Sequence, residues 1–136
     1  MNITRRENFN AAHKLFKPEW SDEKNLEVFG ACANPNWHGH NYILYVTVKG
    51  KPNPETGFVM NLKKLSQLIR RHITEQVDHK NLNLDVPFMN GILPSAENIA
   101  KAFWQQLSPH IEKEGCALHC IKIQETENNS VEYFGD

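Results

Sequence analysis

The spacing of apolar residues changes along this chain from the period of a β-strand to that of an α-helix and back. Residues 38–48 (HGHNYILYVTV) form the clearest strand, because β-branched and aromatic residues dominate there and alternate residues share a face. Residues 3–13, 118–126 and 131–134 are also read as strands, whereas residues 62–77 and 96–107 place apolar side chains at helical spacing. This order predicts an α+β fold, an antiparallel β-sheet with two helices packed on one face.

Polar cap residues indicate where the helices begin. Ser21, Asn61 and Ser95 each stand just before a segment with helical character, where a short polar side chain can accept a backbone N–H. The first of these helices is short and ends at Gly30, and the second ends near Asp78. Residues 50–56 (GKPNPET) predict a turn, after which residues 57–61 return as a short strand in an antiparallel hairpin.

The length of the chain sets the size of the core. With 136 residues, 40% of them hydrophobic and 23% charged, the sequence predicts one globular domain, residues 1–136. A domain of this size buries roughly two thirds of its unfolded surface, so it needs neither a disulfide nor a metal merely to fold. A metal site in this chain would therefore be free for chemistry.

The charge and the cysteine content of the chain limit which partners and which cellular compartment we expect. The formal net charge is −1 and no run of like charges stands out, which argues against a nucleic-acid or anionic-membrane surface. The first ten residues are too polar for a signal peptide, and no segment approaches the ~20 apolar residues of a membrane span. Three cysteines without a framework spacing suit a reducing compartment, so we expect a cytoplasmic protein. Open sheet edges predict self-association.

Two histidines flank a glycine at the start of the clearest strand. His38 and His40 are two residues apart, so their side chains point to one face and can present two imidazoles to one cation. His13, near the end of the first strand, offers a third imidazole. Three such ligands leave the fourth position of a tetrahedral Zn²⁺ open, as in catalytic zinc sites. Spacing alone leaves another interpretation open, in which the pair is accidental and His13 is a hydrogen-bonded core residue.

Three other residues stand where they could serve such a site. Cys32 lies six positions before His38, and a nearby cation would lower the pKa of its thiol and make it a usable base or nucleophile. The alternative for Cys32 is a small buried hydrophobic residue. Asp78 can orient the imidazole of His79 and raise its basicity, or the two can serve only the local structure at a helix C-terminus.

A carboxylate interrupts an apolar strand face near the C-terminus. Glu125 continues the face of Ile121 and Ile123, where another apolar residue is expected. A buried carboxylate needs a partner, and two neighbouring N–H donors on a pterin or guanine ring would provide one. An ion pair with Lys or Arg is the competing explanation.

With these residues identified, the chain resembles the 6-pyruvoyl-tetrahydropterin synthase family, including its bacterial branch, the 6-carboxy-tetrahydropterin synthases of queuosine biosynthesis. The segments that carry the resemblance run nearly from end to end: residues 9–13 (FNAAH), 32–42 (CANPNWHGHNY), 56–57 (TG), 60–62 (MNL), 78–82 (DHKNL), 95–98 (SAEN) and 125–126 (ET). The resemblance implies the tunnelling fold, in which two trimers, each closing a continuous barrel, form a homohexamer.

The same resemblance implies roles for individual residues. It implies that zinc is bound by His13, His38 and His40 and that Cys32 is the proton-transferring thiol. Asp78 and His79 would form a relay that tunes this thiol across a subunit boundary.

The resemblance also implies a pterin-binding pocket. Glu125 would anchor the pterin ring, and Ser95, Ala96 and Glu97 would line the pocket. Two positions depart from the animal enzymes: Trp37 stands where they have Gly, and Ala96 stands where they have Thr.

The family substrate is 7,8-dihydroneopterin triphosphate, a small molecule, and no external redox cofactor is implied. The pyruvoyl branch releases triphosphate and forms 6-pyruvoyl-tetrahydropterin, whereas the carboxy branch also releases acetaldehyde. The five residues between Cys32 and His38 resemble the pyruvoyl-type enzymes more closely. A pterin- or purine-binding module without catalysis and a purely structural metal protein are the alternatives from other classes, and the open set of three histidines argues against the last.

Overall fold

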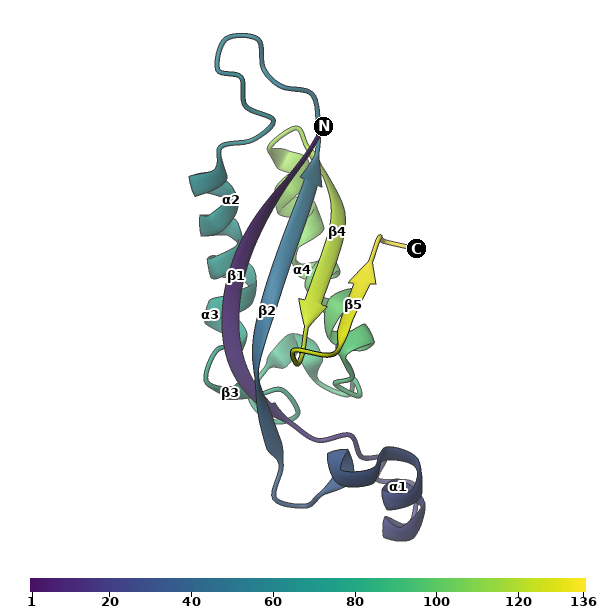
Figure 1. The fold of residues 1–136 in the computed structure, drawn as a ribbon. Coiled ribbons are helices and arrows are strands. Elements are labelled where there is room, and N and C mark those ends of the chain that lie inside the picture. Colours follow the sequence, from purple (N-terminus) through teal and green to yellow (C-terminus); the bar gives the residue numbers. More distant parts are fainter.

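A five-stranded sheet forms the body of the protein, and the computed structural model describes residues 1–136. The long strands β1 (Asn2–His13) and β2 (His38–Lys49) pair antiparallel, and β4 (Ala117–Gln124) and β5 (Ser130–Tyr133) continue the sheet beyond β2 in the same manner. At the other edge, the short strand β3 (Lys80–Asn81) runs parallel to β1. The order β3-β1-β2-β4-β5 makes an open, mostly antiparallel sheet (Figure 1).

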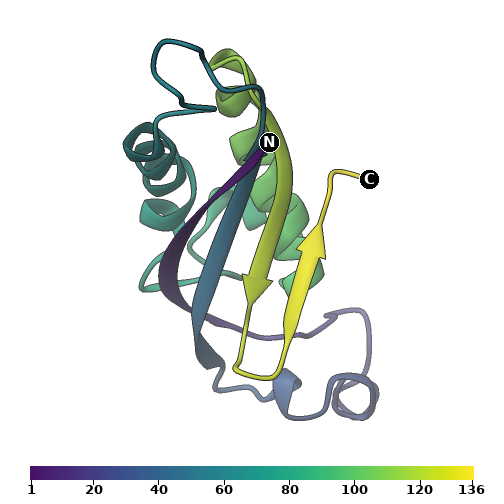
Figure 2. The same cartoon turned by 45° about the horizontal axis from the view of Figure 1, so that its top comes forward.

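Helices cover one face of this sheet. The long helix α4 (Ala96–Lys113) packs on β4 and β5, while α2 (Leu62–Ile69) passes through a π-helical turn (Arg70–Thr74) into α3 (Glu75–Val77) beside β1. Figures 1 and 2 show both segments on the same side of the strands. The predicted α+β class, with helices on one face, is therefore confirmed. None of the helices combines the length and apolar composition that a membrane crossing requires.

The predicted cap residues begin all three of the longer helices. Each side chain accepts a backbone N–H two or three residues further on: Ser21 from Lys24, Asn61 from Lys63, and Ser95 from Asn98. Replacing such a cap by alanine typically costs about 1 kcal/mol. The Ser95 cap matters most for the site, because it sets where α4 starts.

The core lies between the sheet and the two helical segments. Alternate residues of β2 are fully buried from Tyr42 to Val48, and they face the buried side of α4. The buried apolar residues of α2, the π-helical turn and α3 repeat at helical spacing, as expected for a stripe that packs on a sheet. These residues are Leu65, Ile69, Ile73 and Val77. Leu62, which the spacing placed on the same stripe, is instead exposed at the helix start.

Residues 14–37 leave the sheet between β1 and β2 and form a separate lobe. Figure 1 shows its helix α1 (Asp22–Phe29) beyond the ends of the strands. The buried amide of Asn25 holds the lobe together, accepting the backbone N–H of Lys17 and donating to nearby carbonyl groups. A short 3₁₀ turn (Gly30–Ala33) follows α1, so local polar contacts support the loop that carries Cys32.

One sequence prediction about the sheet is wrong, and one short strand was not predicted. Residues 57–61 form no strand, because both edges of β2 are already occupied by β1 and β4 and no free edge remains for a hairpin. Instead, backbone hydrogen bonds between Asn53 and both Gly57 and Phe58 close the segment as a loop. The short strand β3 was not predicted, since two residues carry no detectable period.

Candidate metal and substrate site

The register of β1 and β2 brings three histidines to one point. His13 lies directly opposite His38, and Ala11 lies opposite His40. The three imidazoles therefore share one face of a two-stranded ribbon, and the small side chain of Ala11 leaves room for them beside His40. We call His13, His38 and His40 the histidine group.

The histidine group has the geometry of a metal site. Its ring centroids are 4.5 to 5.1 Å apart, and one ligand nitrogen from each ring lies within 4.8 Å of the others. Four buried ring nitrogens have no hydrogen-bond partner: His13 Nε2, both nitrogens of His38, and His40 Nε2. Buried polar atoms are normally paired, so these nitrogens fit a cation that accepts imidazole ligands.

The backbone fixes the orientation of the His13 ring. Its Nδ1 lies 2.8 Å from the carbonyl oxygen of Pro94, which can only accept, so Nδ1 carries the hydrogen and Nε2 presents its lone pair. Burial lowers the pKa of His13 to about 4, although the bond to Pro94 opposes the shift. Burial and the neighbouring His40 also lower the pKa of His38. At neutral pH both rings are therefore neutral, the form that binds a metal.

A cavity of about 500 Å³ opens beside the histidine group. Most of the residues predicted for the site line it, including Cys32, which is half-buried, and Glu125. The N-terminal turn of α4 forms another wall. The complete lining consists of His13, Leu15, Cys32, Ser95, Ala96, Glu97, Glu125, Asn128, Asn129, Ser130 and Val131.

Some lining residues were missed by sequence reasoning. Residues 128–131, which end the turn after β4 and begin β5, indicated only a turn and the start of a strand, and Leu15 carried no signal at all. Leu15 nevertheless has a defined position, because its backbone N–H donates to the carbonyl oxygen of Cys32 at 2.9 Å. That bond holds the thiol loop against the end of β1.

Glu125 faces the cavity without a basic side chain beside it. Its only ion-pair contact is with His40, at 4.0 Å between Oε1 and Nε2, and neither Lys nor Arg reaches it. The ion pair that competed as an explanation from sequence is therefore absent. The carboxylate remains free to accept hydrogen bonds from a ligand.

Asp78 and His79 contact each other but do not line the cavity of Cys32. Asp78 Oδ2 lies 3.0 Å from His79 Nδ1, and Asp78 Oδ1 accepts the backbone N–H of Asn10 at 2.9 Å. The bond from Asn10, helped by His79, holds the pKa of Asp78 below its usual value. The side chain of His79 is 76% exposed and lines a second cavity of about 630 Å³. One chain alone does not bring this pair to the thiol.

Two non-glycine residues adopt a left-handed backbone, and both adjoin the predicted site. Trp37 has φ +67° directly before His38, and His79 has φ +60°. Such conformations cost of order 1–3 kcal/mol and persist where the surrounding structure imposes them. The angle at Trp37 is one that glycine adopts without strain. The Trp37 ring also lies 4.7 Å from the ammonium of Lys14.

Together these features define an α+β protein with a group of three histidines that could hold a metal ion, beside a cavity of small-molecule size. The model of the 6-pyruvoyl tetrahydropterin synthase family matches residues 2–136. The chain is 42% identical over 134 residues to human 6-pyruvoyl tetrahydrobiopterin synthase, covering 98% of this chain and 91% of the human protein.

Solved structures and a more distant relative agree with this match. The structure of 6-pyruvoyl tetrahydropterin synthase from Caenorhabditis elegans has a TM-score of 0.93 and 34% identity, covering 100% of this chain and 96% of that one. The 6-carboxy-5,6,7,8-tetrahydropterin synthase of Bacillus subtilis is 25% identical over 99 residues, 71% of this chain and 64% of that protein. The chain belongs to the 6-pyruvoyl tetrahydropterin synthase family.

Proposed function

We propose that this chain is a zinc-dependent lyase that converts 7,8-dihydroneopterin triphosphate to 6-pyruvoyl-tetrahydropterin with loss of triphosphate. One observation carries the proposal: His13, whose Nε2 is one of the four unpaired nitrogens of the histidine group, lines the same cavity as Cys32 and Glu125. A ligand site, a thiol and an unpaired carboxylate together provide what such a reaction requires. In this proposal residues 1–136 act as one domain.

The histidine group suits zinc because three neutral imidazoles leave one position of a tetrahedral ion open. A zinc ion held by His13, His38 and His40 would supply Lewis acidity to the hydroxyl groups of the substrate side chain. The Pro94 carbonyl orients the first of these ligands, a contact that typically changes metal affinity 10- to 100-fold.

The remaining cavity residues bind the ring and move protons. The Glu125 carboxylate accepts two N–H groups from the amino-pyrimidine edge of the pterin. Ser95, Ala96 and Glu97, at the start of α4, form the wall beside the ring. In this step the thiolate of Cys32 takes a proton from the substrate side chain, and the resulting thiol returns one at the ring. This role requires a half-buried group that reaches the cavity.

Asp78 and His79 enter the site from a second copy of the chain in this proposal. The Asp78 carboxylate orients the His79 ring through Nδ1, which leaves Nε2 free to exchange a proton with a thiol. Their separation from Cys32 within one chain supports a site completed between subunits. The open edges at β3 and β5 support a homohexamer of two trimers, each closing a barrel.

The pyruvoyl product, an intermediate of tetrahydrobiopterin biosynthesis, is favoured over the 6-carboxy product of queuosine biosynthesis. The chain is 42% identical over 98% of its length to the human pyruvoyl-type enzyme. It is 25% identical over 71% of its length to the carboxy-type enzyme. The loop between Cys32 and His38 agrees with the first assignment.

Turnover of 7,8-dihydroneopterin triphosphate by the purified, zinc-loaded protein tests the proposal. Mass spectrometry should find inorganic triphosphate and 6-pyruvoyl-tetrahydropterin. Acetaldehyde with 6-carboxy-tetrahydropterin would assign the other product instead. Tight pterin binding without any turnover would indicate a binding module. A zinc-loaded protein that neither binds pterin nor turns it over would overturn the proposed function.

A further inference from the structure

The cavity beside the histidine group offers no basic side chain to the triphosphate of the proposed substrate. None of its 11 lining residues is a lysine or an arginine, and two of them, Glu97 and Glu125, are acidic. The N-terminal turn of α4 forms part of the wall, but the Glu97 carboxylate lies in that turn and repels an anion. Proteins usually bind phosphate groups with lysine or arginine. The triphosphate therefore needs a basic side chain from outside this cavity.

The second cavity, of about 630 Å³, contains such a side chain. Lys80 lines it together with His79 and is the only lysine or arginine among the lining residues. The one carboxylate there belongs to Asp85, and its Oδ2 accepts the backbone N–H of Asn81 at 3.0 Å. Lys80 is exposed and forms no ion pair, unlike Lys122, which lies 3.2 Å from a glutamate oxygen. The charge of Lys80 is therefore available to an anionic ligand.

The backbone holds Lys80 at a defined place on the sheet. Lys80 pairs with Ala11 where β3 runs along β1, at the edge of the sheet (Figure 1). On either side of it, the backbone N–H of His79 donates to the carbonyl oxygen of Asn10 at 2.7 Å, and that of Leu82 donates to Ala12 at 2.8 Å. The ammonium group is thus carried by a fixed backbone.

We propose that Lys80 binds the triphosphate group of a substrate molecule held in the cavity of a neighbouring subunit. The inference rests on the proposed function, in which Asp78 and His79 reach the thiol of another copy. A substrate side chain that lies between that thiol and His79 also approaches the cavity that His79 lines. The triphosphate is attached to the same side chain, and the Cα atom of Lys80 is only about 3.8 Å from that of His79. The triphosphate then lies beside the ammonium group.

Lys14 is the competing candidate, because it directly follows the metal-ligand candidate His13. Its ammonium group lies 4.8 Å from the ring centroid of Phe16 and 4.7 Å from that of Trp37. Lys14 lines neither of the two cavities described above, but a smaller one of about 290 Å³ within the lobe, where Asp22 adds a negative charge. The geometry therefore favours Lys80.

Steady-state kinetics of the zinc-loaded protein test the role of Lys80. Lys80→Ala should lower kcat/KM for 7,8-dihydroneopterin triphosphate about tenfold, the effect of losing one hydrogen bond to a charged group. The inhibition constant of 7,8-dihydroneopterin, which carries the ring and side chain without the triphosphate, should not change. The fall of kcat/KM with rising salt should become shallower in Lys80→Ala. Lys80→Arg keeps the charge and should stay within about twofold of wild type.

Lys51→Ala is the matched control. It also removes one exposed ammonium group, from the loop that Figure 1 shows at the opposite end of the strands from β3, and should change none of these quantities. Normal kcat/KM in Lys80→Ala, or an equal weakening of 7,8-dihydroneopterin, would overturn the proposal. A tenfold loss in Lys14→Ala with normal kinetics in Lys80→Ala would assign the role to Lys14 instead.

Mixed oligomers test whether Lys80 acts across a subunit boundary. When Lys80→Ala subunits assemble with an excess of Cys32→Ala subunits, nearly every intact thiol has a neighbour with an intact Lys80. The value of kcat/KM per intact thiol should then return to that of wild type. A value that stays tenfold low would overturn the proposal while leaving the proposed function intact, whereas a wild-type protein without turnover would overturn both.

Discussion

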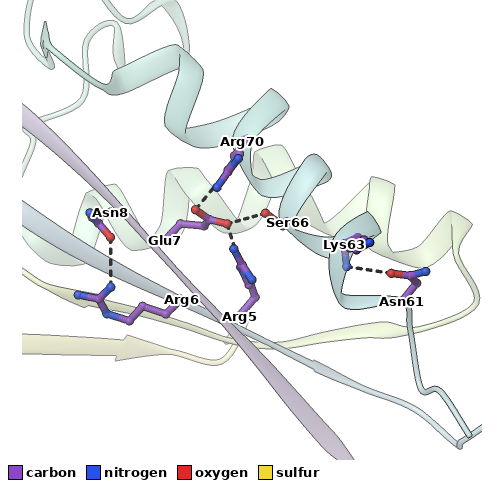
Figure 3. Close-up of polar contacts among 8 residues, drawn as sticks. All are labelled: Arg5, Arg6, Glu7, Asn8, Asn61, Lys63, Ser66 and Arg70. Carbon is purple, nitrogen blue, oxygen red and sulfur yellow. Dashed lines mark hydrogen bonds and ion pairs between the residues drawn. The ribbon is translucent and has the colours of Figure 1, made fainter.

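Two polar clusters lie on the same face of the β1–β2 ribbon. They differ in whether their buried polar atoms have hydrogen-bond partners. In the Glu7 cluster (Glu7, Arg5, Ser66 and Arg70), Oε1 accepts from Ser66 at 2.6 Å and from Arg5 at 2.9 Å, and Oε2 accepts from Arg70 at 3.4 Å (Figure 3). In the histidine group four buried nitrogens have no partner.

The difference separates a structural cluster from a binding site. Glu7 is 8% exposed, and its partners come from β1 and from α2 with the π-helical turn that follows, so it ties the sheet to its helices. The folded chain completes the Glu7 cluster by itself, whereas four nitrogens of the histidine group have no partner within the chain and could bind a metal ion. Unpaired buried polar atoms are thus more informative about function here than burial or charge.

Removing one imidazole should have the largest effect. His38→Ala should abolish stoichiometric zinc binding and reduce kcat/KM on the order of 10³-fold, because two imidazoles rarely hold an open catalytic zinc. Metal analysis and steady-state kinetics measure both quantities. His119→Ala, which removes a half-buried imidazole of β4 outside the group, is the control and should keep metal and activity. Full zinc content in His38→Ala would contradict the assignment.

Removing the thiol should leave the metal in place. Cys32→Ala should lower kcat by about 10²- to 10⁴-fold, the usual contribution of a group that transfers protons, while zinc content stays at wild-type level. Cys116→Ala removes another half-buried thiol, far from the cavity lining, and should have no effect on kcat. If both variants turned over normally, another residue would have to move the proton.

Disrupting the Glu7 cluster should affect stability alone. Ser66→Ala leaves the buried carboxylate short of one donor and should lower the free energy of unfolding by about 1–2 kcal/mol. Denaturant titration measures the loss, and kcat/KM per folded molecule should not change. A large drop in activity without a loss of stability would show that this cluster also serves the reaction.

The stability of the metal-free protein should also fall in two pH windows, which affect stability and not the reaction itself. Burial by itself would raise the pKa of Glu7, but bonds from Ser66 and Arg5 and the nearby arginine charges hold it below 4.5. The Glu7 contribution is therefore complete above pH 4.5 and is lost as the pH falls further. Burial lowers the pKa of His13 from 6.5 to about 4 in the folded protein. As the pH falls, the unfolded state therefore takes up a proton at this residue before the folded state does, and stability falls between pH 6.5 and pH 4.

Variants assign the two windows. Glu7→Gln should reduce the loss of stability below pH 4.5 and leave the loss between pH 6.5 and 4 unchanged. The urea midpoint at each pH measures both. His13→Gln should do the reverse. A single transition unaffected by either variant would mean that other groups dominate the pH dependence.

Much of the fold was predictable because local rules and tertiary packing agree. Alternation in residues 38–48 and helical spacing after Asn61 and Ser95 correspond to the observed strand and helices, and all three predicted caps accept the expected N–H groups. The failure at residues 57–61 is instructive. The strand prediction considered only that segment and β2, whereas the edge it needed was taken by β4, a strand about 60 residues further along the chain.

The site was predictable only in part, for a similar reason. The pair His38 and His40 follows from the two-residue period of a strand, but the position of His13 opposite His38 depends on the pairing register. The Glu7 cluster carried no signal, and residues 128–131 indicated only local structure, because the residues that they meet are distant in sequence.

The sequence by itself determined the types of element, their caps and the chemical groups available to a metal and a pterin. Only the tertiary structure decided which of these groups meet and which lack a partner. Period and capping act between residues a few positions apart, so they can be read locally. Hydrogen-bond pairing inside the molecule depends on strand register and on the approach of helices from elsewhere in the chain, which no local pattern encodes.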